Sequence, residues 1–132
     1  MTIKEFEVQL ALGLLTYRMK RELAHNPNTS KRILAKLSGD KDYSIRHNIA
    51  SNSNASVKVL IYLSADKHWI IRKCVAGNSN TSVEILKKLS TDVSWNVRTG
   101  VAHNPNTPKK ILVRLSKDKD MNVKYVARKA LL

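Results

Sequence analysis

Apolar residues recur along the chain in short clusters whose members are three or four positions apart. Ile33, Leu34 and Leu37 form one cluster, and Ile45 and Ile49 form the next. This spacing brings apolar side chains to one face of an α-helix, and no stretch alternates apolar and polar residues as a half-buried strand does. The pattern therefore predicts an all-α protein in which a first helix is followed by a second, shorter one.

The pattern returns every 26 residues without insertions. Two asparagines open each unit, and leucine, serine, aspartate, branched apolar, basic and alanine columns keep the same register. The aligned columns are Asn26, Asn52, Asn78 and Asn104; Asn28, Asn54, Asn80 and Asn106; Leu34, Leu60, Leu86 and Leu112; Leu37, Leu63, Leu89 and Leu115; Ser38, Ser64, Ser90 and Ser116; Asp40, Asp66, Asp92 and Asp118; Ile45, Ile71, Val97 and Val123; Arg46, Arg72, Arg98 and Lys124; and Ala24, Ala50, Ala76 and Ala102. Self-similarity at a fixed period of this length indicates a solenoid in which each unit packs on its neighbours.

The repeats divide the chain into one structural domain with a distinct start. We expect four two-helix units at residues 26–51, 52–77, 78–103 and 104–129, with a short tail to residue 132. Residues 1–25 are a degenerate unit that begins with a capping box of Thr2 and Glu5 and an apolar helix running up to Gly13. Such a helix suits the exposed end of a solenoid.

Helix starts are marked by short polar residues. Thr29, Thr81 and Thr107 are the predicted N-caps of the first helices, and Pro108 is placed at the first helical position, where its missing N–H costs nothing. Thr81 also has capping-box spacing to Glu84. The second helices are expected to start near Asp42, Ser94 and Asp120.

The unit N-P-N-T-P-x-x-I-L-x-x-L-S-x-D-x-D-x-x-V-(R/K)-x-x-V-A resembles the leucine-rich-repeat-variant family, which is related to HEAT repeats. The likeness covers residues 26–129 and rests on spaced columns. It implies a right-handed α-α superhelix with two helices in each repeat, the shorter of them 3₁₀ in some members. Some members also carry an amino-terminal iron–sulfur cysteine cluster, but no cysteine precedes Cys74 here. The family's members share no single biochemical function, so the likeness speaks to fold and not to role.

The aspartate and basic columns lie six residues apart, as Asp40 and Arg46 do. In HEAT-type repeats, which this spacing resembles, such a pair forms a ladder between neighbouring repeats, and we favour that structural role over a ligand-binding arginine row. The asparagine columns flank a turn and are also interpreted as structural. The predicted ladder residues are Asp40, Arg46, Asp66, Arg72, Asp92, Arg98, Asp118 and Lys124.

A mostly aromatic column begins the second helices: Tyr17, Tyr43, Trp69, Trp95 and Met121. Exposed rings beside arginine can stack on nucleic-acid bases. The alternative is that the rings pack on their neighbours, and we favour packing because a methionine at this position suits packing better than stacking.

The net charge of +14 is the outlying property of the composition. It favours a polyanionic partner, whether nucleic acid, an anionic membrane surface or an acidic protein, while solubility alone is the alternative explanation. The ladder charges cancel one another, which leaves semi-regular basic columns as the candidate nucleic-acid-binding residues: Arg32, Lys36, Lys41, Lys58, Lys67, Lys88, Lys110, Arg114 and Lys119. Such stripes suit a phosphate backbone, although the sequence places them on more than one face.

These observations predict a non-catalytic binding scaffold that holds nucleic acid without reading its sequence. A protein–protein adaptor for an acidic partner is the alternative. A relative of the HEAT-like DNA glycosylases is a remote third possibility, with Trp69, Trp95 and Asp92 as its only candidates. We expect no catalytic residues, no metal, no cofactor and no small-molecule substrate. No stretch is long and apolar enough to span a bilayer, and the chain begins without a signal peptide, so a cytoplasmic location is expected.

Overall fold

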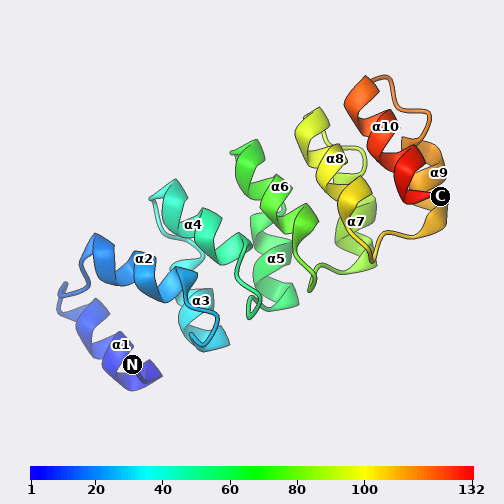
Figure 1. The fold of residues 1–132 in the computed structure, drawn as a ribbon. Helices are drawn as coiled ribbons and strands as arrows, with labels where there is room; N and C mark the ends of the chain where they lie inside the picture. The colour runs from blue at the N-terminus through cyan, green and yellow to red at the C-terminus, as the bar shows by residue number, and fades with distance from the viewer.

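The computed structural model describes residues 1–132 as ten α-helices without a strand (Figure 1). The all-α prediction is confirmed. None of the helices combines the length and apolar character needed to cross a membrane. The helices are α1 (Ile3–Ala11), α2 (Tyr17–His25), α3 (Lys31–Leu37), α4 (Tyr43–Ala50), α5 (Val57–Leu63), α6 (Trp69–Gly77), α7 (Val83–Leu89), α8 (Trp95–His103), α9 (Lys109–Leu115) and α10 (Met121–Ala130).

The helices form two rows along an elongated molecule, with the chain termini at opposite ends (Figure 1). We call α3, α5, α7 and α9 the first-helix row, and α2, α4, α6, α8 and α10 the second-helix row. Successive second helices pack directly on one another, whereas each first helix packs mainly on the second helices that precede and follow it in the chain. The second-helix row is therefore the more closely packed side of the molecule.

One continuous cluster of 26 buried residues runs between the two rows. Each first helix contributes a buried stripe such as Ile33, Leu34 and Leu37, and each second helix contributes a pair such as Ile45 and Ile49. The apolar spacing in the sequence thus marks the core-facing side of each helix. Because each unit exposes this side without its neighbours, burial of the stripe requires stacking.

The first helices begin one residue later than predicted. Ser30, Ser56 and Ser82 are their N-caps, and the hydroxyl of Ser82 accepts from the Ile85 N–H, so the predicted Thr81–Glu84 capping box is wrong. The threonines are buried instead, where the Thr107 hydroxyl donates to the Val101 carbonyl at 2.6 Å. The Thr81 hydroxyl donates in the same way to the Val75 carbonyl, while the buried hydroxyl of Thr29 has no hydrogen-bond partner.

Two further details of the helices differ from expectation. Pro108 is the N-cap residue of α9 and not its first helical residue. The second helices have 8 to 10 residues against 7 for the first helices, so the second helix is the longer of each pair and is α-helical throughout. The capping box of Thr2 and Glu5 is confirmed, and Gly13 has a positive φ of 66° in the turn after α1.

Helices α6 and α8 approach each other most closely at Gly100. A Cβ atom at this position would lie 3.1 Å from the Ala76 Cβ and 3.2 Å from the Lys73 carbonyl oxygen. One of these atoms is a Cβ and the other is a backbone oxygen of α6, so neither can move away by a side-chain rotation. The glycine therefore sets the spacing of these two helices.

We expect Gly100→Ala to lower the free energy of unfolding by about 1–3 kcal/mol, because the added methyl group overpacks the α6–α8 contact. Gly77→Ala is the matched control, since nothing lies within 4 Å of its added Cβ. Removing a helical glycine there should leave stability unchanged or raise it slightly. Urea denaturation of the three proteins measures the difference, and equal losses in both variants would contradict the close-contact explanation.

Candidate functional site

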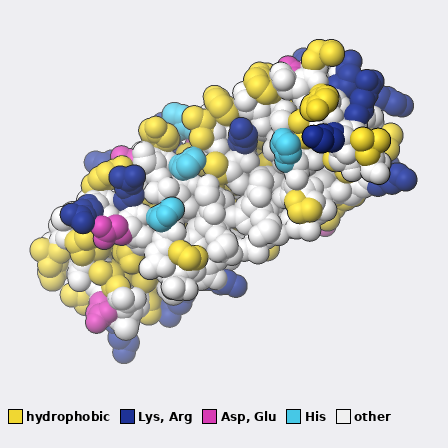
Figure 2. Space-filling model, in the orientation of Figure 1, with side chains coloured by type: hydrophobic (Ala, Val, Ile, Leu, Met, Phe, Trp, Pro, Cys, Tyr) yellow, Lys and Arg dark blue, Asp and Glu magenta, His cyan; other side chains and the backbone are white.

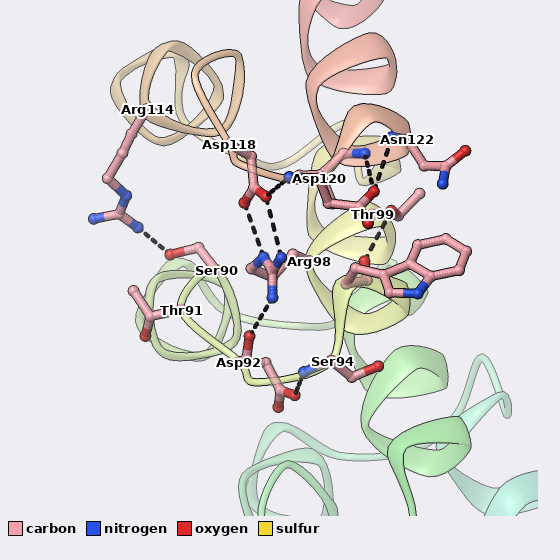
Figure 3. Close-up of polar contacts among 12 residues, drawn as sticks. Ser90, Thr91, Asp92, Ser94, Arg98, Thr99, Arg114, Asp118, Asp120 and Asn122 are labelled. Atoms are coloured by element: carbon pink, nitrogen blue, oxygen red, sulfur yellow. Dashed lines mark hydrogen bonds and ion pairs between the residues drawn. The ribbon is translucent and has the colours of Figure 1, made fainter.

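Arginines of the second helices form ion pairs with aspartates of the following unit. Arg46 Nε lies 2.7 Å from Asp66 Oδ2, and Arg98 Nε lies 2.8 Å from Asp118 Oδ2 with a second contact from Nη2 to Oδ1 at 3.1 Å (Figure 3). Arg72 and Asp92 repeat the arrangement at 2.8 Å. The side chains of all six residues are largely buried. The pairs are therefore part of the packing between units.

Each of these arginines also closes the loop that precedes its own helix. Arg46 Nη1 donates to the carbonyl oxygens of Asp40 at 2.7 Å and Lys41 at 3.0 Å. One guanidinium group thus holds two loops, one by its backbone carbonyls and the next by its carboxylate. The planar fork of arginine is suited to this double role, which a lysine ammonium cannot reproduce.

The two aspartates that bond to each arginine have different roles. The residue six positions before Arg46 is Asp40, and it contributes its carbonyl oxygen, while the carboxylate partner lies 20 residues after the arginine. Lys20 supplies the missing base at the start, with its Nζ 2.9 Å from Asp40 Oδ2. Lys20 lies 26 residues before Arg46, and this spacing could have identified it as a ladder base from the sequence. Lys124 lies in the same column, and its Nζ lies 4.0 Å from the Met121 Sδ.

The ladder carboxyls are held in their charged form. Burial acts to raise the pKa of Asp92, but hydrogen bonds from Arg72 and from the Ser94 N–H outweigh it and leave that pKa below its usual value. The same balance lowers the pKa of Asp66 and Asp118. The positive and negative charges of the ladder therefore cancel, and the excess positive charge of the chain lies on other residues.

Both asparagine columns bond across the unit boundary. Asn78 is buried, and its Nδ2 donates to the carbonyl oxygens of Ala50 at 2.8 Å and Asn52 at 3.0 Å in the preceding unit. Its Oδ1 accepts from the Asn80 N–H at 2.9 Å, as the turn interpretation predicts. Asn52 and Asn104 make equivalent bonds. The first acceptor carbonyl lies in the last turn of a helix, where it has no partner within that helix. The second lies just beyond the helix end and also accepts a backbone N–H.

All nine candidate binding residues are exposed, and none lies on the second-helix row. Arg32 and Lys36 are on α3, four positions apart and hence on one helix face, and Lys110 and Arg114 repeat this on α9. The remaining residues lie on α5, α7 and the loops from a first to a second helix: Lys58, Lys88, Lys41, Lys67 and Lys119. The structure therefore gathers the three columns along the first-helix row and its loops.

One column also connects units. Lys88 Nζ lies 3.2 Å from the Ser64 hydroxyl, Arg114 bonds to the Ser90 hydroxyl (Figure 3), and Lys36 Nζ lies 3.4 Å from Glu7 Oε1. These bases remain exposed while leaning toward the preceding unit. The columns are interrupted at Tyr62, Glu84 and Val93, so the positive surface has breaks in its central units.

Two shallow depressions lie between neighbouring units beside the ladder. One is bordered by Lys41 and Lys67 around the Arg46–Asp66 pair, and the other by Arg114, Lys117 and Lys119 around the Arg98–Asp118 pair. Lysine and arginine side chains also gather at the carboxyl-terminal end of the molecule (Figure 2). The ladder thus supplies the floor of each depression and free bases supply the rim. No group of three His, Cys, Asp or Glu residues lies in an arrangement that would hold a metal ion.

The aromatic column is only partly packed. Trp69 and Trp95 each keep 41% of their surface exposed, and Tyr43 keeps 49%. The packing interpretation accounts for the buried part of each ring and not for the rest.

No protein-family model matches the chain, and no curated protein sequence shows a significant match.

Acid should unfold the protein through the ladder. A carboxyl group whose pKa is lower in the folded protein than its usual 3.8 stabilises the fold above that pH, and this stabilisation is lost as the pH falls through the lower folded-state pKa. We therefore expect the free energy of unfolding to fall steadily as the pH drops below about 4. Asp92→Asn should be less stable at neutral pH and lose less stability on acidification, since it lacks one such group. Denaturant titrations from neutral pH to pH 3 test this, and parallel pH profiles for the two proteins would contradict it.

Removing a buried amide should destabilise the unit boundary. Asn78→Ala leaves the Ala50 carbonyl oxygen without this donor and removes one of the two donors of the Asn52 carbonyl. We expect a loss of about 1–3 kcal/mol in the free energy of unfolding. Asn80→Ala is the control, because Asn80 also donates to carbonyls of the preceding unit but is exposed, so water can replace it. Thermal and urea unfolding measure both, and an equal or larger loss for Asn80→Ala would refute the buried-donor argument.

Proposed function

We propose that this chain is a non-catalytic scaffold that holds nucleic acid through the phosphate backbone, without base readout. The observation that carries the proposal is the placement of all nine candidate bases on the first-helix row and its loops, in columns that recur with the repeat. Packed helices lie ~9 Å apart, so four units extend for roughly 35 Å, close to one turn of duplex. Cations in register over that length suit a regular polyanion.

The proposal includes the architecture that presents these bases. We infer four 26-residue two-helix units in a right-handed superhelix, as the resemblance to leucine-rich-repeat-variant proteins implies, with residues 1–25 as the cap. The recurrence of the same Asn, Arg and Asp bonds with a shift of 26 residues supports equivalent units. A cytoplasmic protein of this kind would meet RNA and DNA directly.

The ladder residues support a role outside catalysis. The Asp92 carboxylate accepts from Arg72 Nε and Nη2 and from the Ser94 N–H, as its counterparts in the neighbouring units do from theirs. A carboxylate committed to these bonds is a poor general base. This favours a binding scaffold over the glycosylase alternative.

Salt-dependent binding tests the proposal. We expect micromolar binding of duplex DNA at low salt, with an affinity that falls steeply as salt rises, because each neutralised phosphate releases counterions. Lys58→Gln combined with Lys110→Gln should weaken binding uniformly across sequences and reduce the slope of log affinity against log salt by about 1–2. Fluorescence anisotropy at several salt concentrations measures both quantities.

Arg21→Gln combined with Lys129→Gln is the matched control, since it removes two exposed charges from the second-helix row. It should change the salt slope much less. Absence of binding to duplex DNA, single-stranded DNA and RNA at low salt would eliminate the proposal. Recovery of one acidic protein in a pull-down that nuclease does not affect would favour the adaptor alternative.

A further inference from the structure

A row of half-exposed rings lies at the amino-terminal ends of the second helices. Tyr17, Tyr43, Trp69 and Trp95 are the first residues of α2, α4, α6 and α8, so the leading unit and the next three units each present one ring, while the last unit presents Met121. Hydrophobic side chains follow the upper margin of the face in Figure 2, above the first turns of α4, α6 and α8. A ring that served only to pack would be covered in at least one unit, but all four are exposed.

The row continues between units through a ring contact. The centroids of the Tyr43 and His68 rings lie 5.5 Å apart with an interplanar angle of 40°. His68 directly precedes Trp69, so three rings from two units follow one another along the edge. The row is therefore not a set of isolated side chains.

The residues directly before the two tryptophans are not carboxylates. Asp42 and Asp120 precede Tyr43 and Met121 and cap their helices with side-chain hydrogen bonds. The equivalent residues before the tryptophans are His68 and Ser94, and neither makes a side-chain cap bond. The nearest carboxylates, Asp66 and Asp92, are paired with ladder arginines. The two central units thus lack an unpaired carboxylate where the tryptophans stand, which supports a negatively charged occupant.

Exposed cations flank Tyr43 and Trp69, whereas the corresponding positions beside Trp95 are Val93 and Thr99. Lys41 and Lys67 lie two residues before Tyr43 and Trp69, in the loops that lead to α4 and α6. Lys73 lies four residues after Trp69 and so shares its face of α6. Rings separated by lysines are an unusual centre for a protein–protein interface, where lysine is depleted. Alternating π-faces and cations are the chemistry that binds a single strand.

We propose that Tyr43, Trp69 and Trp95 stack the bases of a single-stranded nucleic acid, with Lys41, Lys67 and Lys73 contacting its phosphates. This inference rests on the proposed function and names the form of nucleic acid that the ring row holds. Stacking tolerates any base, because every base has a π-face. The first-helix lysines contribute charge to duplex and single strand alike, whereas the ring row distinguishes between them.

Tryptophan fluorescence gives a direct readout, because the chain contains only 2 tryptophans and both belong to the row. The wild-type protein is titrated with oligothymidine and with duplex DNA of the same length at two salt concentrations. We expect saturable quenching by the single strand and much less by the duplex. Trp95→Leu should weaken oligothymidine binding about 5- to 100-fold and leave duplex binding unchanged. Trp95→Tyr should restore most of the loss, because it keeps a stacking ring.

Tyr125→Leu is the matched control, since Tyr125 is an exposed ring in α10 outside the row. It should leave both affinities unchanged, and circular dichroism verifies that each variant is folded. Duplex binding without quenching by the single strand, or equal losses for Trp95→Leu on both nucleic acids, would overturn the inference and leave the proposed function intact. Failure of both nucleic acids to bind at low salt would overturn the two together. Quenching by an acidic protein and not by oligothymidine would assign the row to a protein partner and overturn it as well.

Discussion

The stacking of this chain depends on buried asparagine amides that join each unit to the one before it. A helix leaves carbonyl groups without partners at its carboxyl end, and here those ends lie in the interior between units. Asn52, Asn78 and Asn104 each donate one hydrogen bond to such a carbonyl and a second to a carbonyl of the adjoining turn, and each accepts one from the following turn. Water cannot reach these positions, so the repeat requires an amide there. The second helices can then approach closely, and Gly100 and Ala76 show how small residues permit that approach.

The arginine–aspartate ladder has a comparable role at the opposite end of each second helix. Its guanidinium groups hold one loop by backbone carbonyls and the next by a carboxylate. The paired charges of the ladder cancel one another, and their side chains are largely buried. The consequence for function is that the large net charge is carried by residues without a ladder partner. The nine candidate bases among those residues lie on the first helices and their loops, while the rings lie at the start of the second helices.

Some expectations were wrong because several residues compete for one role. A threonine in an N-P-N-T turn is a good N-cap in isolation, yet the hydroxyl of Thr107 is buried and bonds to Val101. The following position takes the capping role, and Ser82 supplies the hydroxyl there. The six-residue spacing of Asp40 and Arg46, in turn, does not say which atoms of each residue form the bonds. Arg46 bonds to the backbone carbonyl of Asp40 and to the carboxylate of Asp66 in the next unit.

The sequence by itself determined the period, the helical class and the set of residues that face the core, since these follow from spacing along one chain. It also determined which columns carry charge. Only the tertiary structure decided which unit each polar side chain serves, because the bonds of Asn78 and Arg46 cross a boundary that spacing within a unit does not describe. Tertiary structure likewise decided that Trp69 and Trp95 remain half exposed. Exposure depends on how closely neighbouring helices approach, and that distance is set by side chains far apart in sequence, such as Ala76 and Gly100.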